Sequence, residues 1–128
     1  MSYYFSKTVQ TTFDDAVNRV TEELKKEGFG VLTSIDVKET LKKKSNVDFR
    51  NYRILGACNP HFAYQALQAE DKIGTMLPCN VIVQEIEGVG AEVAAVDPVA
   101  SMQAVKNPDL EKIAAQVREK LKTVIARL

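Results

Sequence analysis

Residues 79–98 have the sequence CNVIVQEIEGVGAEVAAVDP, and this stretch decides the fold. Its first part, Val81–Ile86, is β-branched and largely apolar, which is typical of a strand. Gly88-Val89-Gly90 supplies the backbone freedom that a hairpin turn requires, and Ala91–Val96 follows as the returning strand. Asp97-Pro98 ends that strand. We therefore predict an antiparallel pair of strands at this point of the chain.

Three further strands are predicted upstream of the hairpin. They are runs rich in aromatic and β-branched residues, namely Tyr3–Gln10, Phe29–Val37 and Tyr52–Cys58. In the second run, alternate residues from Val31 to Val37 lie on one side, as in a half-buried strand. The third run is short and mostly apolar, which favours a buried strand, and it stops at Asn59-Pro60.

Two helices are predicted in the first half of the chain. Thr12 and Asp15 resemble a capping box, and the apolar residues after them recur at helical spacing until Gly28. Asp36-Val37-Lys38-Glu39 places an acidic residue three positions after a capping aspartate. This spacing predicts a short second helix that carries Leu41.

Two more helices are predicted after Asn-Pro dipeptides. Asparagine at the N-cap accepts a hydrogen bond from a free N–H group, and proline at the first helical position gives up a donor that has no partner there. Asn59-Pro60 thus begins a helix that runs to about Glu70, and Asn107-Pro108 begins the last one. The last helix is amphipathic, with apolar residues at Leu110, Ile113, Ala114, Val117, Leu121, Val124, Ile125 and Leu128.

The predicted element order is βαβ(α)βαββα. Strands that alternate with helices favour a two-layer α/β (α+β) fold, with one mixed β-sheet packed against helices. No linker interrupts the chain, so we expect residues 1–128 to form a single domain. Each half begins with a strand, a helix and a strand, an order compatible with an internal duplication.

Composition limits the classes of function. Lysine plus arginine and aspartate plus glutamate both number 17, so the chain lacks the basic excess that nucleic-acid binding requires. No apolar stretch approaches the roughly 20 residues of a membrane span, and the first residues do not resemble a secretory leader. We expect a soluble, cytoplasmic protein that binds neither nucleic acid nor membranes.

Cys58 is the best candidate nucleophile. In Gly56-Ala57-Cys58-Asn59-Pro60-His61, a thiol, an amide and an imidazole meet where a strand ends and a helix begins. Strand ends of this kind often hold ligands, and a helix N-terminus favours anions and lowers the pKa of a nearby thiol. In the simpler interpretation, Cys58 packs as a small buried hydrophobe, Asn59 caps the helix and His61 is solvated.

Cys79-Asn80 repeats the Cys-Asn pair. If the strands before and after the intervening helix are parallel, the two thiols lie too far apart for a disulfide, which needs Cα atoms within about 7 Å. The irregular stretch from Asp71 to Pro78 is long enough to reverse that conclusion. Cys79 then either shares a site with Cys58 or simply packs beneath Pro78. The spacing of the two cysteines and the single histidine does not favour a zinc site.

Three other charged groups are weaker candidates. The run 42–44 of three lysines could bind phosphate but is typical of a solvated face. Glu85 and Glu87 alternate on a predicted strand and could form an acid and base pair, or lie exposed at an edge. Asp36 and Asp97 each follow a strand, where they suit either a ligand pocket or a helix cap.

Three segments resemble a known family. YRILGACNP at 52–60, LPCNVIV at 77–83 and IDVKET at 35–40 are similar to the bacterial and archaeal domain-of-unknown-function family 302. The resemblance implies a compact two-layer α/β domain that associates as a homodimer, and it implies no reaction. It also implies a set of candidate pocket positions: Asp36, Lys38, Cys58, Asn59, Pro60, Pro78, Cys79 and Asn80.

Three hypotheses for function follow. The first is a binding module that holds a small, anionic ligand near Asn59, His61 and Asn80. The second is a thiol enzyme or redox protein that uses Cys58, with His61 or Cys79 as its partner. The third is a dimeric scaffold that associates through the apolar stripe of the last helix or through an exposed sheet edge. The sequence identifies no cofactor.

Overall fold

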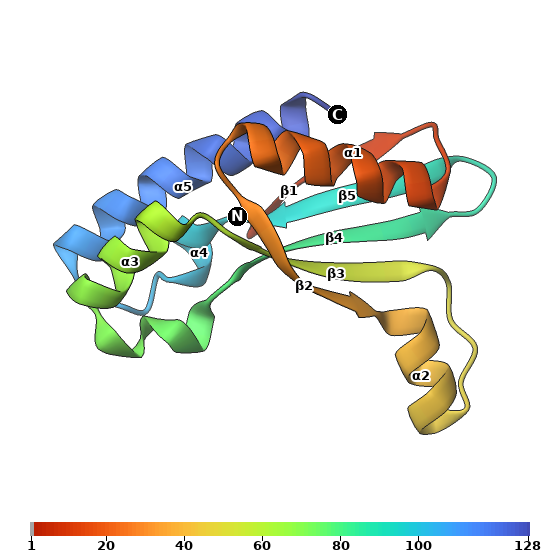
Figure 1. The fold of residues 1–128 in the computed structure, drawn as a ribbon, viewed down its shortest axis with the longest axis horizontal. Helices are drawn as coiled ribbons and strands as arrows, with labels where there is room; N and C mark the ends of the chain where they lie inside the picture. The colour runs from red at the N-terminus through yellow and green to blue at the C-terminus, as the bar shows by residue number, and fades with distance from the viewer. Residues whose placement is uncertain (1) are drawn as a thin grey trace.

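A computed structural model describes residues 2–128, and its centre is one five-stranded sheet (Figure 1). The strands lie side by side in the order β1-β5-β4-β3-β2. Their bounds are β1 Tyr4–Val9, β2 Gly30–Asp36, β3 Tyr52–Cys58, β4 Cys79–Ile86 and β5 Gly90–Val96. The predicted hairpin is present as β4 and β5, joined through Gly88 and Gly90, which both have positive φ.

Every strand pairing recorded for residues 2–128 is antiparallel. The α+β class is therefore confirmed, but the sheet is not mixed. The difference arises between β3 and β4, where the chain leaves Cys58 and re-enters the sheet at Cys79 beside Ala57. The intervening residues make an excursion at one end of the sheet, instead of crossing over to the other end as a parallel pair requires.

The four predicted helices begin close to the capping positions that the sequence indicates. Their bounds are α1 Phe13–Lys26, α2 Val37–Ser45, α3 Pro60–Ala69, α4 Pro98–Ser101 and α5 Pro108–Ala126, and a 3-10 helix, η1, covers Asp71–Met76. Thr12 and Asp36 cap α1 and α2, because their side chains accept hydrogen bonds from the backbone N–H groups of Asp15 and Glu39. Asn107 likewise accepts from two N–H groups at the start of α5. None of these described helices is both long and apolar enough to cross a membrane.

One face of the sheet carries the core. Helices α1 and α5 pack against this face, whereas α2 projects from the sheet beyond β2 (Figure 1). The buried residues of α1 recur at helical spacing, and the inward residues of β4 and β5 are small or β-branched. The central buried set includes Val20, Leu24, Leu55, Val81, Val83, Val93, Leu121 and Val124. We call the other side of the sheet, on which alternate residues such as Asn80, Ile82, Gln84, Glu92 and Ala94 lie, the open face.

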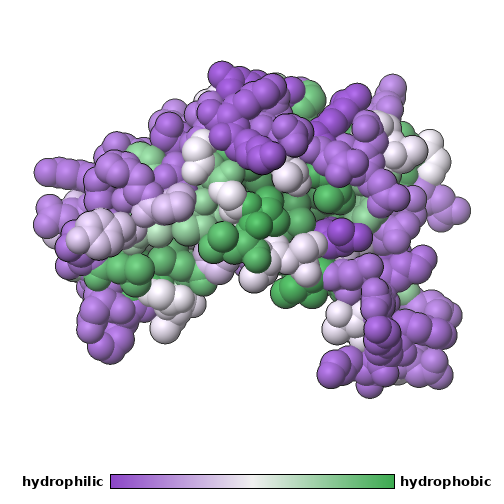
Figure 2. All heavy atoms as spheres, viewed as in Figure 1, coloured by the Kyte–Doolittle hydropathy of each residue, from purple (hydrophilic) through white to green (hydrophobic). Residues whose placement is uncertain are grey.

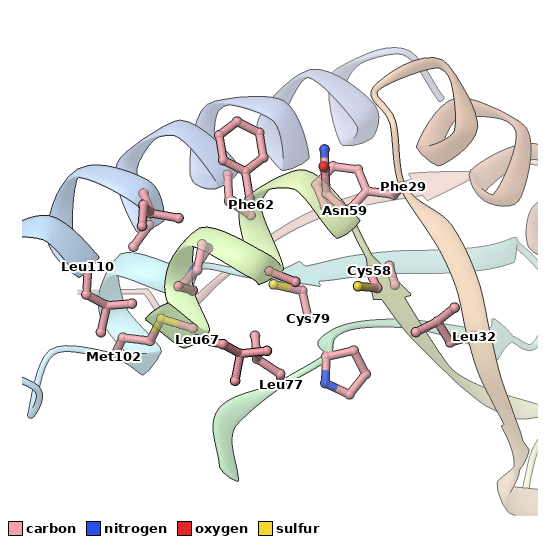
Figure 3. A pocket seen from close by; sticks show the side chains of 18 residues that line it. Phe29, Leu32, Cys58, Asn59, Phe62, Leu67, Leu77, Cys79, Met102 and Leu110 are labelled. Atoms are coloured by element: carbon pink, nitrogen blue, oxygen red, sulfur yellow. The ribbon is translucent and has the colours of Figure 1, made fainter. Parts of the chain in front are cut away.

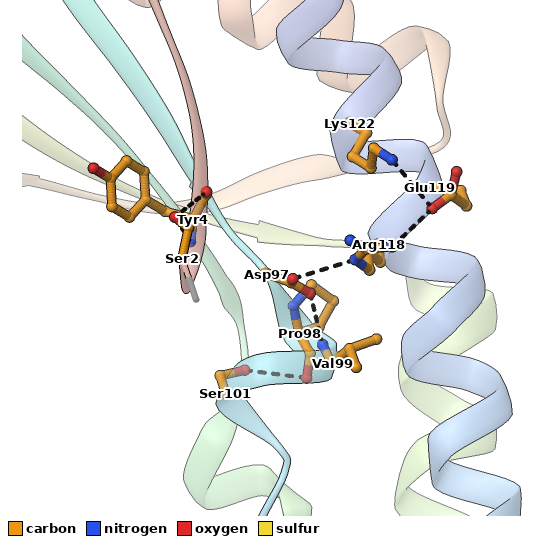
Figure 4. A network of polar contacts seen from close by, with 9 residues as sticks. All are labelled: Ser2, Tyr4, Asp97, Pro98, Val99, Ser101, Arg118, Glu119 and Lys122. Atoms are coloured by element: carbon orange, nitrogen blue, oxygen red, sulfur yellow. Dashed lines mark hydrogen bonds and ion pairs between the residues drawn. The ribbon is translucent and has the colours of Figure 1, made fainter.

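Helix α4 is an element that the sequence analysis did not predict. Asp97 ends β5, as predicted, and also begins this short helix by accepting a hydrogen bond from the Val99 N–H at 3.0 Å. Its other carboxylate oxygen accepts from Nε of Arg118 on α5 at 3.2 Å, and Arg118 also pairs with Glu119 (Figure 4). Since Asp97 is only 8% exposed, these contacts satisfy a buried charge and hold α4 against α5.

Candidate functional site

An apolar cavity of about 280 Å³ lies at the end of the sheet where β3 stops and β4 starts (Figure 3). Its walls come from the strand ends, from α3 and from the α4–α5 segment. The lining residues are Phe29, Leu32, Ala57, Cys58, Asn59, Phe62, Ala63, Ala66, Leu67, Leu77, Pro78, Cys79, Pro98, Met102, Leu110, Ile113, Ala114 and Val117. Residues from four separate parts of the chain thus enclose one space.

The excursion between β3 and β4 builds this cavity. Because the two strands are antiparallel, residues 59–78 must leave and return at the same end of the sheet. Helix α3 packs against α5 in doing so, and η1 packs against α3. Leu110, Ala114 and Val117 recur along one side of α5 and face the same space.

The cavity is open to solvent at an apolar rim. Leu32 and Leu67 both line it, although 67% and 43% of their surfaces are exposed. Apolar surface extends across the middle of the molecule in the region of α3 and β2, flanked by hydrophilic residues (Figure 2). Water therefore reaches large aliphatic side chains at this mouth, and covering them with an apolar molecule is favourable.

Cys58 and Cys79 both line the cavity as free thiols. Cys79 pairs with Ala57 across the β3–β4 ladder, so the two cysteines occupy neighbouring positions on adjacent strands. The parallel arrangement that would have separated them is absent from this ladder. Cys58 is half-buried and Cys79 is 9% exposed.

Burial controls the chemistry of the inner thiol. Loss of hydration, and to a smaller extent the neighbouring Cys58, raise the pKa of Cys79 from 9.0 to about 11. Desolvation disfavours the thiolate, which is the nucleophilic form of cysteine. Cys79 therefore remains protonated near neutral pH and is poorly suited to start a nucleophilic reaction.

Asn59 occupies the N-cap position of α3 but does not cap it. Its side chain makes no hydrogen bond to the first turn, and Nδ2 instead donates to the Glu27 carbonyl oxygen at 3.3 Å. The expected capping bond is thus replaced by a bond that ties the start of α3 to the end of α1. Asn59 carries the only side-chain amide among the residues that line the cavity.

Two candidates from the Cys-Asn motifs lie outside the cavity lining. His61 is exposed on the first turn of α3, where Nε2 lies 3.1 Å from the Gln65 side-chain nitrogen. Asn80 is exposed and lies on the open face, because successive residues of a strand point to opposite sides and Cys79 points to the covered side. The three residues Asn59, His61 and Asn80 are therefore not brought together.

Asp36 and Lys38 lie far from the cavity. Asp36 pairs with Arg53 in the ladder, whereas Gly30, at the other end of β2, pairs with Cys58. Leu32 is the residue of β2 that lines the cavity, and four residues at a rise of about 3.3 Å separate it from Asp36 by roughly 13 Å along the strand. Asp36 caps α2 and Lys38 is exposed on that helix, so these residues belong to a different part of the molecule.

The remaining charged candidates are exposed residues, several of which pair with neighbouring side chains. Within the lysine run, Lys42 pairs with Asp48 and Lys43 with Glu39, both on exposed surface. Glu85 is exposed, and it accepts a hydrogen bond from Asn51. Glu87 follows the end of β4, so the two glutamates do not alternate on one strand as expected. Nowhere in residues 2–128 do three or more potential metal-ligating side chains gather.

Sequence reasoning missed the apolar lining, most of all Met102 and Leu32. Met102 follows the unpredicted helix α4, and Leu32 is the extra residue where the β2–β3 register shifts between Val31 and Thr33. A bulge can redirect a side chain without leaving a sequence signal. The α5 residues were predicted, but as an ordinary core stripe.

Comparisons with known proteins agree with the fold. A family model described as Domain of unknown function DUF302 matches residues 5–128. The crystal structure of an uncharacterized conserved DUF302 protein from Bacillus stearothermophilus is 30% identical in sequence. The similarity covers 99% of this chain and 98% of that one, with a TM-score of 0.91. No curated protein matches the sequence. The chain belongs to the DUF302 family of domains of unknown function.

Proposed function

We propose that the protein binds a small, mainly apolar molecule in the cavity between α3, α5 and the ends of β3 and β4. The observation that carries this proposal is a space of about 280 Å³ whose lining is apolar except for Asn59 and the two thiols. Protein interiors are otherwise close-packed, and an apolar cavity of roughly 150 Å³ is already large enough for benzene. The cavity here is nearly twice as large, so a ligand larger than benzene fits.

The lining favours an apolar ligand over a small anion. None of the residues that line the cavity is lysine, arginine or histidine. An anion buried without a cation or several hydrogen-bond donors loses far more hydration than it regains. We therefore place the apolar part of the ligand in the cavity and leave Asn59 as the one amide able to orient a polar group.

Filling the cavity tests the proposal. Ala63 lines it from α3, so Ala63→Leu should occupy part of the space and weaken binding of anilinonaphthalene sulfonate about tenfold or more, measured by fluorescence titration. Ala115 is exposed on α5 and does not line the cavity, so Ala115→Leu serves as the control. Equal affinities for both variants and the unmodified protein would count against the site.

A thiol reaction at Cys58 is a second candidate. The half-buried Cys58 lines the same cavity next to the start of α3, which supports access for a small electrophile. His61 does not line the cavity, so Cys79 is the favoured partner of Cys58 in such a reaction. The rate of alkylation of Cys58→Ser and Cys79→Ser variants against pH tests this, because a reactive Cys58 should label well below pH 8.

Homodimer formation is a third candidate, and the open face supports it. The apolar stripe of α5 is occupied within the monomer, whereas Tyr4 and Ile82 lie on the open face of the sheet, opposite the face that α1 and α5 cover. Sedimentation at micromolar concentration should give a dimer, and Ile82→Lys should give a monomer. Val89→Lys, in the exposed hairpin turn, is the control. A monomeric unmodified protein would reject this candidate.

A further inference from the structure

A second hollow lies directly beside the apolar cavity. It has a volume of about 230 Å³, and its lining residues are Val99, Met102, Gln103, Lys106, Leu110, Glu111 and Ala114. Three of these, Met102, Leu110 and Ala114, also line the first cavity. The same three side chains therefore form the partition between the two spaces.

Met102 is the movable part of this partition. Leu110 and Ala114 are fixed on the long helix α5, but Met102 follows the four-residue helix α4. Its side chain is unbranched and has three rotatable bonds, so it adopts alternative rotamers at low cost. Met102 is 8% exposed and belongs to an apolar cluster with Leu110 and Ala114, and no hydrogen bond of its side chain is recorded among residues 2–128, so a rotamer change breaks no polar contact.

The polar character of the two spaces differs. The first is lined almost wholly by apolar residues, whereas the second carries Lys106 and Glu111 at its outer side. Lys106 is exposed and takes part in no ion pair recorded for residues 2–128. An apolar chamber that leads past a flexible side chain to a free ammonium group suits an amphiphile with an acidic head.

We infer that the two spaces together bind a single-chain carboxylate of the fatty-acid class, with its chain in the first cavity and its carboxylate at Lys106. Met102 turns aside to let the chain pass. This inference rests on the proposed function and extends it, since it names the ligand class and the route of the chain.

The volumes set the chain length. A methylene group needs about the room of one water molecule, which takes roughly 30 Å³ in the liquid, so the first cavity holds roughly nine groups. A longer chain must pass Met102 and use the second space, which nearly doubles the room. The carboxylate gains only modestly from Lys106, because exposed ion pairs are weak and Glu111 lies in the same lining.

A chain-length series tests the inference on the intact protein. Alkanoates from hexanoate to hexadecanoate, and the matching alkanols, are titrated against bound anilinonaphthalene sulfonate below their micelle concentrations. Each added methylene should tighten binding about fourfold, and the gain should continue well beyond nine carbons. At equal chain lengths beyond about nine carbons, where the chain passes Met102 and its head group reaches Lys106, the carboxylate should bind about two- to fivefold more tightly than the alcohol.

Three variants identify the residues involved. Met102→Phe should abolish the gain beyond about nine carbons, because the stiffer ring blocks the passage, and it should weaken the binding of short chains much less. Lys106→Gln should remove the advantage of the carboxylate over the alcohol. Lys112→Gln, a matched change at an exposed lysine that lines neither space, should leave it intact.

The possible results separate the inference from the function beneath it. If affinity stops rising near nine carbons in the unmodified protein, or if acids and alcohols bind equally, the inference is wrong while apolar binding stands. If no alkyl chain displaces the probe and Ala63→Leu also has no effect, both are wrong. The series on the unmodified protein decides the matter even if Met102→Phe does not fold.

Discussion

Alkaline pH should weaken folding through the buried thiol of Cys79. Burial, and secondarily Cys58, raise the pKa of this thiol from 9.0 to about 11 in the folded protein. Unfolding exposes the thiol to water, so the unfolded chain releases its proton first as the pH rises. The stabilising contribution of the protonated thiol is fully present below about pH 9 and is lost as the pH approaches 11.

The size of this effect follows from the shift in pKa. Each pKa unit corresponds to about 1.4 kcal/mol, so a shift of about two units gives a loss of roughly 2–3 kcal/mol across the whole window. Between about pH 8 and about pH 10.5, the part of the window that is experimentally convenient, we expect about 2 kcal/mol. This is a large share of the stability of a domain of this size.

Urea unfolding of the unmodified protein and of Cys79→Ala measures the effect. The variant has no thiol to titrate at this position, while tyrosines and lysines titrate in both proteins and cancel in the difference. The stability advantage of the unmodified protein should shrink by about 2 kcal/mol over the range. Cys58→Ser should keep most of the loss of stability at high pH, since burial is the larger cause of the raised pKa of Cys79. Parallel pH profiles for the unmodified protein and Cys79→Ala would refute the reasoning.

Three substitutions test other parts of the fold by urea or thermal unfolding. Asp97→Ala removes the cap of α4 and the ion pair to α5, and should cost about 1–3 kcal/mol; a loss below about 0.5 kcal/mol would contradict its assigned role. Asn107→Ala should cost about 1–2 kcal/mol, because its side chain caps α5 and also donates to the Ala69 carbonyl oxygen at 2.8 Å; an unchanged midpoint would argue against this cap. Gly90→Ala should cost at least about 2 kcal/mol, since φ is +152° and a Cβ atom there would clash with the backbone of β1, whereas Gly30→Ala has free space and should be nearly neutral.

Elements whose signals are local were predictable from the sequence. β3 has the predicted bounds, Tyr52–Cys58, because its apolar run ends sharply at Asn59-Pro60. The two Asn-Pro dipeptides mark the starts of α3 and α5, although only Asn107 caps its helix with its side chain. In each case a few neighbouring residues fix the backbone, so no knowledge of distant contacts is needed.

The direction of β4 relative to β3 was not predictable in the same way. The 20 residues from Asn59 to Pro78 are long enough for a helical crossover that joins parallel strands. They are equally long enough for an excursion that returns to the same end of the sheet. What distinguishes the two is how α3 packs on α5 and η1 packs on α3, which is a tertiary property.

The candidate site was predictable only in part, for a related reason. Cys58, Asn59 and Cys79 are unusual residues, so they draw attention in a sequence and do line the cavity. The rest of the lining is made of aliphatic residues, phenylalanine, methionine and proline, and the sequence pattern of such residues is the same whether they pack tightly or leave a void. A void is a property of how side chains from several elements meet, and it leaves no periodicity.

The two Cys-Asn pairs show how equal motifs acquire different roles. In the first pair, Asn59 follows the end of β3 and its side chain ties α3 to α1. In the second, Asn80 lies within β4, where the alternation of a strand turns it to the open face as Cys79 turns inward. The cysteines therefore converge on one cavity while the asparagines separate. Only one of the two amides, that of Asn59, lines the shared space, so its chemistry is set mainly by sulfur and hydrocarbon, and for this reason we propose a ligand recognised by shape and apolar surface.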